Sequence, residues 1–228
     1  MARELVVHNL IGPGDQARQD YASMLARQEA AHAARIRGEI PDTLFLLEHE
    51  PVITLGRASK KEHVLATPER LASLGIECHE IGRGGDVTYH GPGQLVVYPI
   101  LDLRPDRCDV RRYVRNLEEV MIQVAESYGL SGHRVEGKTG AFCDGRKFGA
   151  LGVRISRWVT MHGIAINVST DLDAFSLIVP CGLPTTPVTS LRREIAEGTQ
   201  LSLEDASERA IRCFTDVFGY TLRPGQGA

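Results

Sequence analysis

The sequence predicts an α/β (α+β) fold with a mixed, largely antiparallel sheet packed by helices. Short apolar runs typical of strands recur along the chain, and Asp144–Gly145 is a strong hairpin signal between two of them. Strands and helices alternate too irregularly for a doubly wound parallel sheet. The 228 residues contain no repeat, low-complexity linker or break in composition, so we expect one domain over residues 1–228 with a frayed tail over about 223–228.

Two helices and five strands are expected in the first half of the chain. Gly14–Arg37 is rich in Ala, Gln, Glu and Arg and predicts a helix that opens near Asp15. A short helix is expected after Thr67, because Thr is a good N-cap and Pro68 suits the first helical position. The expected strands are Glu4–Asn9, Thr43–Glu48, Val52–Leu55, Ile76–Ile81 and Leu95–Leu103.

The second half predicts two long helices and a strand-rich region between them. Asp109 is expected to cap a helix over Val110–Tyr128, with Gly129 just past its end. A final amphipathic helix should begin at Ser202 or Leu203 and reach about Phe218. The segments between are expected to form strands at Ala141–Cys143, Lys147–Ile155 and within Trp158–Val168, the last interrupted at His162–Gly163, and a helical turn at Leu172–Ile178.

Composition excludes several classes of protein. The formal net charge of −3 carries no nucleic-acid signature, although Arg clusters occur at 111/112/115, 154/157 and 192/193. No apolar run approaches the roughly 18 residues of a membrane span, and no signal peptide is visible, so we expect no membrane partner. The five Cys are odd in number and lack zinc-site spacing, which favours reduced thiols and a cytoplasmic protein.

The segment Arg83–Gln94 is the first candidate site. It reads Arg-Gly-Gly-Asp-Val-Thr-Tyr-His-Gly-Pro-Gly-Gln and lies between apolar runs. Glycine lets the backbone approach a ligand closely, so the segment predicts a pocket wall. The alternative is a hairpin turn with polar decoration.

Cys181 and Lys147 are the candidate reactive residues. Cys181 lies between Pro180 and Gly182, which would let a carbonyl group approach its sulfur. Lys147 lies in an apolar strand and could activate a thiol, because a nucleophilic Cys needs a nearby cation or base. The alternatives are a small buried hydrophobe for Cys181, as expected for the other four cysteines, and an edge-strand lysine whose ammonium reaches solvent.

Four motifs occur in a fixed order and carry a family resemblance. They are Arg83–Gln94, Lys147 followed by Ala150-Leu151-Gly152, His162–Asn167, and Pro180-Cys181-Gly182, with Val188–Leu191 continuing the series. In this combination the chain closely resembles the lipoyl(octanoyl) transferases of the biotin/lipoate protein ligase-like superfamily, over roughly residues 44–191. It has Gly140-Ala141-Phe142 where that family commonly has Gly-Val-Trp or Gly-Val-Tyr, so we expect altered pocket packing with unchanged chemistry.

The resemblance implies transfer of an octanoyl group from acyl carrier protein to a lysine of lipoyl domains. The acceptors would be the lipoyl domains of 2-oxoacid dehydrogenase complexes and the glycine cleavage H protein. Cys181 would carry the acyl group as a thioester and Lys147 would lower the pKa of its thiol, without ATP, metal or other cofactor. The residues implied to line the acyl site are Arg83, Gly84, Gly85, Asp86, Val87, Thr88, Tyr89, His90, Ala150, Leu151, Gly152, Gly163, Ile164 and Ala165.

Further roles are expected around this core. His90 and His162 are expected to orient the substrate or backbone, the backbone of Gly84–Gly85 and Cys181 to supply oxyanion donors, and small residues such as Gly149 to leave room for the acyl chain. The Arg clusters offer docking sites for acidic carrier domains. Three other functions stay open: an ATP-dependent lipoate or biotin ligase, a Cys-dependent octanoyl amidotransferase between lipoyl-type domains, and a binding module without turnover.

Overall fold

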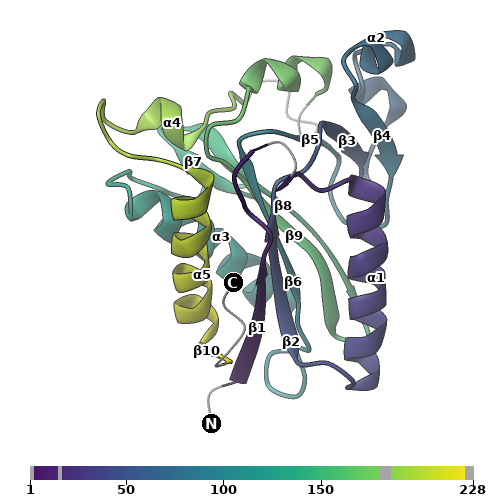
Figure 1. The fold of residues 1–228 in the computed structure, drawn as a ribbon, viewed down its shortest axis with the longest axis vertical. Helices are drawn as coiled ribbons and strands as arrows, with labels where there is room; N and C mark the ends of the chain where they lie inside the picture. Colours follow the sequence, from purple (N-terminus) through teal and green to yellow (C-terminus); the bar gives the residue numbers. More distant parts are fainter. Residues whose placement is uncertain (1–2, 15–16, 180–185, 224–228) are drawn as a thin grey trace.

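The computed structural model describes residues 3–14, 17–179 and 186–223. A seven-stranded sheet with the order β10-β1-β2-β6-β9-β8-β7 forms the centre of the molecule (Figure 1). β1 pairs in parallel with β10 and β2, and every other pairing in this sheet is antiparallel, which confirms the predicted mixed, largely antiparallel sheet. The strands are β1 (Arg3–Asn9), β2 (Asp42–Leu47), β6 (Gln94–Ile100), β7 (Ala141–Cys143), β8 (Arg146–Ser156), β9 (Val159–Asn167) and β10 (Tyr220–Leu222).

A second sheet has three strands in the order β4-β3-β5. β3 (Val52–Leu55) pairs in parallel with β4 (Glu77–Glu80) and antiparallel with β5 (Val87–His90). Residues Val87–His90 of the glycine-rich segment are therefore a strand, β5, which the sequence analysis did not predict. Its register places Leu55 opposite Val87 and Val52 opposite His90, so this sheet fixes the direction in which the segment runs.

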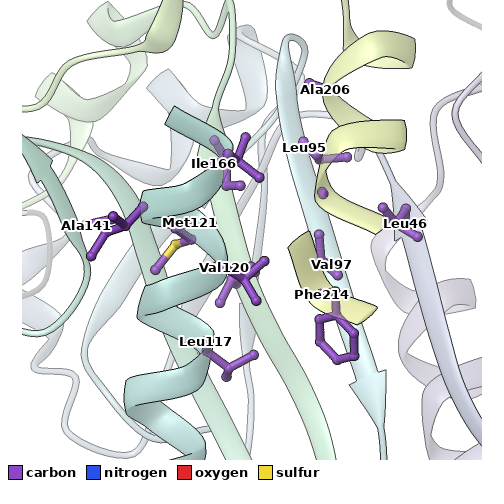
Figure 2. Close-up of a cluster of buried hydrophobic side chains, with 14 of the residues drawn as sticks. Leu46, Leu95, Val97, Leu117, Val120, Met121, Ala141, Ile166, Ala206 and Phe214 are labelled. Carbon is purple, nitrogen blue, oxygen red and sulfur yellow. The ribbon is translucent and has the colours of Figure 1, made fainter. Parts of the chain in front are cut away.

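Helices cover both faces of the main sheet (Figure 1). α1 (Tyr21–Arg37) packs on one face, where Met24 meets apolar side chains of β2, β6 and β9. α3 (Val110–Glu126) and α5 (Leu203–Phe218) pack on the other face. Figure 2 shows that second layer, with Met121 of α3 beside Ala141 of β7 and Phe214 of α5 near Val97 of β6.

Helix ends follow the capping residues in the sequence. The side chains of Thr67 and Asp109 accept hydrogen bonds from backbone N–H groups in the first turns of α2 (Pro68–Ser73) and α3, as predicted. Ser202 caps α5 in the same way, so this helix begins at Leu203, one of the two predicted starts. α1 begins at Tyr21 and not near Asp15, because the Asp20 carboxylate accepts the N–H of Ser23 and caps the helix there. The described residues also form the short helices η2 (Lys61–His63), η3 (Leu172–Leu177) and α4 (Leu191–Glu194).

The strands β7, β8 and β9 form consecutive hairpins. Asp144 and Gly145 both have positive φ, 45° and 76°, and join β7 to β8 as predicted. The expected interruption of β9 at His162–Gly163 is wrong, because the ladder with β8 continues through both residues. His162 does take a left-handed φ of 59°, so the sequence signal marks a local backbone distortion inside a continuous strand.

Candidate functional site

A cavity of about 260 Å³ lies where the small sheet meets β8 and β9 of the main sheet. The start of α1, β6 and the loop 137–139 complete its wall. The structure thus brings together segments up to about 140 residues apart in sequence. The predicted residues that line the cavity are Arg83, Gly85, Asp86, Val87, Thr88, His90, Lys147, Ala150, Leu151, Gly152, Gly163, Ile164 and Ala165.

Two predicted lining residues lie outside the cavity wall. The Tyr89 ring packs edge-on against Phe175, 5.7 Å between centroids, in the core beneath the small sheet. The backbone N–H of Gly84 donates to the carbonyl of Val153 at 2.9 Å and ties the glycine-rich loop to β8. That N–H is therefore engaged and is not the oxyanion donor expected from the sequence, whereas Gly85 does line the cavity.

Lys147 reaches the cavity through an irregularity in β8. Along the β7–β8 ladder, Phe142 pairs with Lys147 and Ala141 pairs with Gly149, so β8 contains one extra residue at this point. Phe148 and Gly149 both meet the α3 side: Phe148 lies in that core, and a Cβ on Gly149 would lie 2.6 Å from the Met121 sulfur. The bulge lets Lys147 share a cavity with Ala150, which a regular alternation would place on the opposite face.

Lys147 is 7% exposed, and it is surrounded by the Phe142 ring and the segment 187–189. Its Nζ lies 5.9 Å from the centre of the Phe142 ring. Phe142 is the aromatic residue of Gly140-Ala141-Phe142, the segment that differs from the family pattern, so this difference lies beside the Lys147 amino group. The backbone N–H of Lys147 donates to the Pro187 carbonyl at 2.8 Å, and its own carbonyl accepts the N–H of Thr189 at 2.9 Å. The segment 187–189 therefore runs beside Lys147.

Cys181 lies outside the described residues, but both flanks of its segment contact the site. The Val179 N–H donates to the backbone carbonyl of His63 at 2.8 Å, and the His63 ring meets the carboxylate of cavity residue Asp86 at 2.6 Å. On the other flank, Nζ of Lys138 donates to the Thr186 hydroxyl at 2.8 Å. Lys138 lines the cavity as well. Val179 and Thr186, the described residues on the two sides of the Cys181 segment, are thus both linked to residues of the cavity wall.

Arg83 braces the wall of the cavity. Its side chain is buried, and Nη2 donates to the carbonyl and the hydroxyl of Thr54 at 2.8 and 2.9 Å. Gly152 permits this arrangement, because a Cβ there would lie 2.9 Å from Cδ of Arg83 and from the Gly84 carbonyl. A cation in this wall therefore also binds the glycine-rich loop to β3.

The histidines of the site are neutral near pH 7. Burial lowers the pKa of His90 and of His162 to about 3 and that of His49 to about 4, with nearby positive groups, Arg83 among them, adding to the shift for His90 and His162. Groups with such low pKa values are poor proton acceptors at neutral pH. This supports the expectation that His90 and His162 orient other groups.

Sequence reasoning missed much of the cavity's aromatic wall. Tyr21 at the start of α1 and Tyr98 of β6 both line it, and the Tyr98 hydroxyl is 2.8 Å from Nε2 of buried His49. Burial raises the pKa of Tyr21 to about 12. Neither tyrosine belongs to a motif, because each reaches the cavity only through long-range packing. Gly137, Lys138 and Thr139 were missed for the same reason.

The glycines of the site have different functions from those expected. Gly149 faces Met121 on the opposite side of the sheet, so the expectation that it leaves room for an acyl chain is wrong. Gly163 lines the cavity, but a Cβ there would lie 2.1 Å from the Val97 carbonyl, which makes it a packing requirement. Ala150 of β8 and Ala165 of β9 pair across the two strands, next to the Gly152–Gly163 pair. All four of these small residues line the cavity.

The described ranges contain neither a metal-binding cluster nor a membrane-spanning helix. Within residues 3–14, 17–179 and 186–223, no group of three or more His, Cys, Asp or Glu could hold a metal ion. Across the same ranges, no helix is long and apolar enough to cross a bilayer.

Comparison with known proteins places the chain in a family. Residues 20–215 match the lipoyl protein ligase A/B catalytic domain. An octanoyltransferase of Solibacter usitatus is 50% identical over 208 residues, which cover 91% of this chain and 93% of the relative.

Solved structures show the same fold at low sequence identity. A T. acidophilum protein assigned as a lipoate protein ligase, with bound lipoic acid, has a TM-score of 0.71 at 17% identity, covering 98% of this chain and 88% of that one. A lipoate-protein ligase A bound with ATP has a TM-score of 0.67 at 19% identity, with the same coverage. The family match over most of the chain and the 50% identical relative show that this chain belongs to the lipoyl protein ligase A/B catalytic domain family.

Proposed function

We propose that this chain is an acyltransferase that moves an octanoyl group from acyl carrier protein to a lysine of a lipoyl domain, the first step of protein lipoylation. The observation that carries the proposal is a single cavity in which a buried lysine, Lys147, meets apolar and small side chains, in a chain 50% identical to an octanoyltransferase.

The cavity wall suits a saturated acyl chain joined to a carbonyl group. The Ala150–Ala165 pair and the rings of Tyr21 and Tyr98 supply apolar surface. Burial of about six methylenes of an octanoyl chain contributes on the order of 5 kcal/mol. The cations Lys147, Lys138 and Arg83 line the same cavity and would favour a carbonyl oxygen that gains negative charge.

Cys181 is our proposed nucleophile and Lys147 its activating group. The Lys147 amine accepts the thiol proton and, as the resulting ammonium, stabilises the thiolate, which attacks the donor thioester; a new C–S bond forms, the donor C–S bond breaks, and the released carrier thiolate receives that proton. The exchange of one thioester for another needs no ATP. The contacts of Val179 with His63 and of Thr186 with Lys138 support this assignment, because both flanks of the Cys181 segment lie beside the cavity.

Transfer to the acceptor completes the reaction. The lysine amine of the lipoyl domain attacks the Cys181 thioester, a C–N bond forms, and the C–S bond breaks. The proton lost from nitrogen passes through Lys147 to the Cys181 sulfur. The amide product is more stable than the thioester, so this step drives the overall transfer without ATP, metal or other cofactor.

Acyl carrier protein and acceptor domains are the proposed partners, the acceptors being lipoyl domains of 2-oxoacid dehydrogenases and the glycine cleavage H protein. Both partner classes are acidic, and the partly buried Arg154 lies near the cavity. Arg154 is on β8, close enough to cavity residue His162 to lower the pKa of that imidazole. A catalytic thiol requires a reducing compartment, and the described cysteines at 78, 108, 143 and 213 are free, so we propose a cytoplasmic enzyme.

An ATP-dependent lipoate ligase is the second candidate, favoured by the shared fold of an ATP-bound ligase. The two are separated by offering the full chain and a lipoyl domain either octanoyl-acyl carrier protein alone or free octanoate with ATP. We expect octanoylated lipoyl domain from the first mixture and none from the second. If octanoylated lipoyl domain forms only from octanoate with ATP, the chain is a ligase and not a transferase. If it forms from neither mixture, both functions are rejected.

A further inference from the structure

A buried chain of hydrogen bonds behind the cavity has one allowed direction. The side-chain nitrogen of Gln94 donates to the carbonyl of Tyr89 at 3.2 Å and to Oδ1 of Asn167 at 2.9 Å, and Nδ2 of Asn167 donates to the carbonyl of Thr189 at 3.0 Å. Backbone carbonyls only accept, so the two carbonyls fix the orientation of both amides. The oxygen Oε1 of Gln94 must therefore face His90, whose Nδ1 is 2.7 Å away.

This direction determines where the His90 proton resides. Because Oε1 of Gln94 is an acceptor, Nδ1 of His90 carries the hydrogen. Burial keeps the imidazole neutral by lowering its pKa to about 3. A neutral imidazole has one N–H, so Nε2 carries a lone pair. His90 lines the cavity, and its ring thus offers a hydrogen-bond acceptor there and no donor.

The reacting groups differ in what such an acceptor can bind. A thioester has a carbonyl oxygen and a sulfur that accept hydrogen bonds, and an alkyl chain makes none. The attacking amine has N–H groups. Resting on the proposed function, we infer that Nε2 of His90 accepts an N–H of the acceptor lysine and orients its nitrogen toward the Cys181 thioester.

His90 holds the amine and does not deprotonate it. The amine lone pair forms the C–N bond, the C–S bond breaks, and the proton leaves through Lys147 to the Cys181 sulfur, as in the proposed transfer. The expectation that His90 orients the substrate or backbone thereby becomes specific to the amine, because a hydrogen-bond acceptor cannot hold the thioester carbonyl, which is also an acceptor.

Gln94 and Asn167 are positioning residues in this scheme. The chain that fixes His90 continues from Asn167 to Thr189, whose N–H donates to the Lys147 carbonyl at 2.9 Å. The Thr189 side chain is held in turn by Glu194. One network therefore joins the acceptor in the cavity wall to the strand that carries Lys147.

The tautomer is tested by NMR of the full chain labelled with nitrogen-15 at histidine. At neutral pH we expect the His90 signals of a protonated Nδ1 and an unprotonated Nε2. Gln94→Met should disturb this pattern, whereas Gln123→Met, a half-exposed glutamine on α3, should leave it unchanged. A protonated Nε2 in the unmodified chain would overturn the inference whatever the enzyme's activity.

The role is tested by measuring the two half-reactions separately. In Gln94→Met and His90→Leu we expect octanoyl transfer from the preformed Cys181 thioester to the lipoyl domain to slow about tenfold or more, with Cys181 acylation much less affected. Equal loss in both half-reactions would refute the amine contact while leaving the proposed transferase intact. Absence of both half-reactions in the unmodified chain would instead refute the proposed function.

Discussion

Lys147 and Ala150 lie three residues apart on β8 and both line the same cavity. Strand alternation alone would place them on opposite faces, and the bulge at Phe148–Gly149 reconciles them. The bulge depends on close packing, because Gly149 fits against Met121 of α3. The site therefore gains its buried cation from a local break in the sheet.

Gly140→Ala should impair thiol activation through Lys147. Gly140 has a φ of 126°, and a Cβ there would lie 2.7 Å from Cε of Lys147. We expect the substitution to displace the lysine and to lower the rate at which Cys181 is acylated by octanoyl-acyl carrier protein. The matched control is Gly129→Ala, which has a φ of 78° and no atom near the added Cβ. The control should lose about 1–2 kcal/mol of stability, and Gly140→Ala should lose more, because its Cβ would also lie 2.4 Å from the backbone carbonyl of Gly149. Equal acylation rates in the two variants would contradict the contact.

Gly163→Ala should destabilise the fold far more than an ordinary glycine substitution. The added Cβ would lie 2.1 Å from the backbone carbonyl of Val97 and 2.6 Å from Pro99, in the centre of the main sheet. We expect a loss of more than about 3 kcal/mol in chemical denaturation. Gly12→Ala, where the Cβ meets Ala17 at an ordinary 3.5 Å, is the control and should change stability little. A small loss of unfolding free energy in both variants would contradict the prediction, because it would mean that β6 and β9 can move apart to accept the added Cβ.

Stability should fall as the pH drops below about 6.5. Burial lowers the folded-state pKa of His49 to about 4 and of His90 and His162 to about 3, so the unfolded chain binds more protons than the folded one between these values and 6.5. Each histidine can remove up to about 1.4 kcal/mol per pH unit in that window. Thermal unfolding between pH 7.5 and 5, with His49→Gln as comparison, measures this. The unfolding temperature should depend less steeply on pH in His49→Gln than in the unmodified chain. Equal pH dependence in the two proteins would contradict the burial of a neutral His49.

Lys147→Ala should shift the alkylation of Cys181 to higher pH. Removal of the cation leaves the thiolate less stabilised, so a higher pH is needed to form it. Alkylation is followed on the Cys181 peptide by mass spectrometry, because Cys78 and Cys108 are exposed and also react. Lys60→Ala, at an exposed lysine, is the control. An unshifted profile in the Lys147 variant would remove Lys147 from the activation step.

The sequence predicted the elements whose signals are local. The caps Thr67 and Asp109 and the Asp144–Gly145 turn each act within a few residues, and the structure confirms them. Three of the four motifs also predicted most of the cavity wall, because each of them supplies neighbouring lining residues in the described part of the chain, whereas Pro180-Cys181-Gly182 lies outside it. The start of α1 was wrong because Asp20, five residues beyond Asp15, provides the cap.

Features that depend on long-range pairing could not be predicted. The bulge in β8 is visible only in its register with β7, and the orientation of Gly149 follows from it. Tyr21 and Tyr98 reach the cavity from α1 and β6, and nothing in their neighbouring residues indicates this. The direction of the His90 hydrogen bond depends on Asn167, a residue 77 positions away in the printed sequence.

Intact-mass spectrometry is the most direct test of octanoyl transfer through Cys181. The full chain is incubated with octanoyl-acyl carrier protein in the absence of ATP, and the modified peptide is then identified. We predict a gain of one octanoyl group on Cys181, no gain in Cys181→Ala, and loss of the group when lipoyl domain is added. An octanoyl group on another residue, or an undiminished gain in Cys181→Ala, would contradict the proposed mechanism.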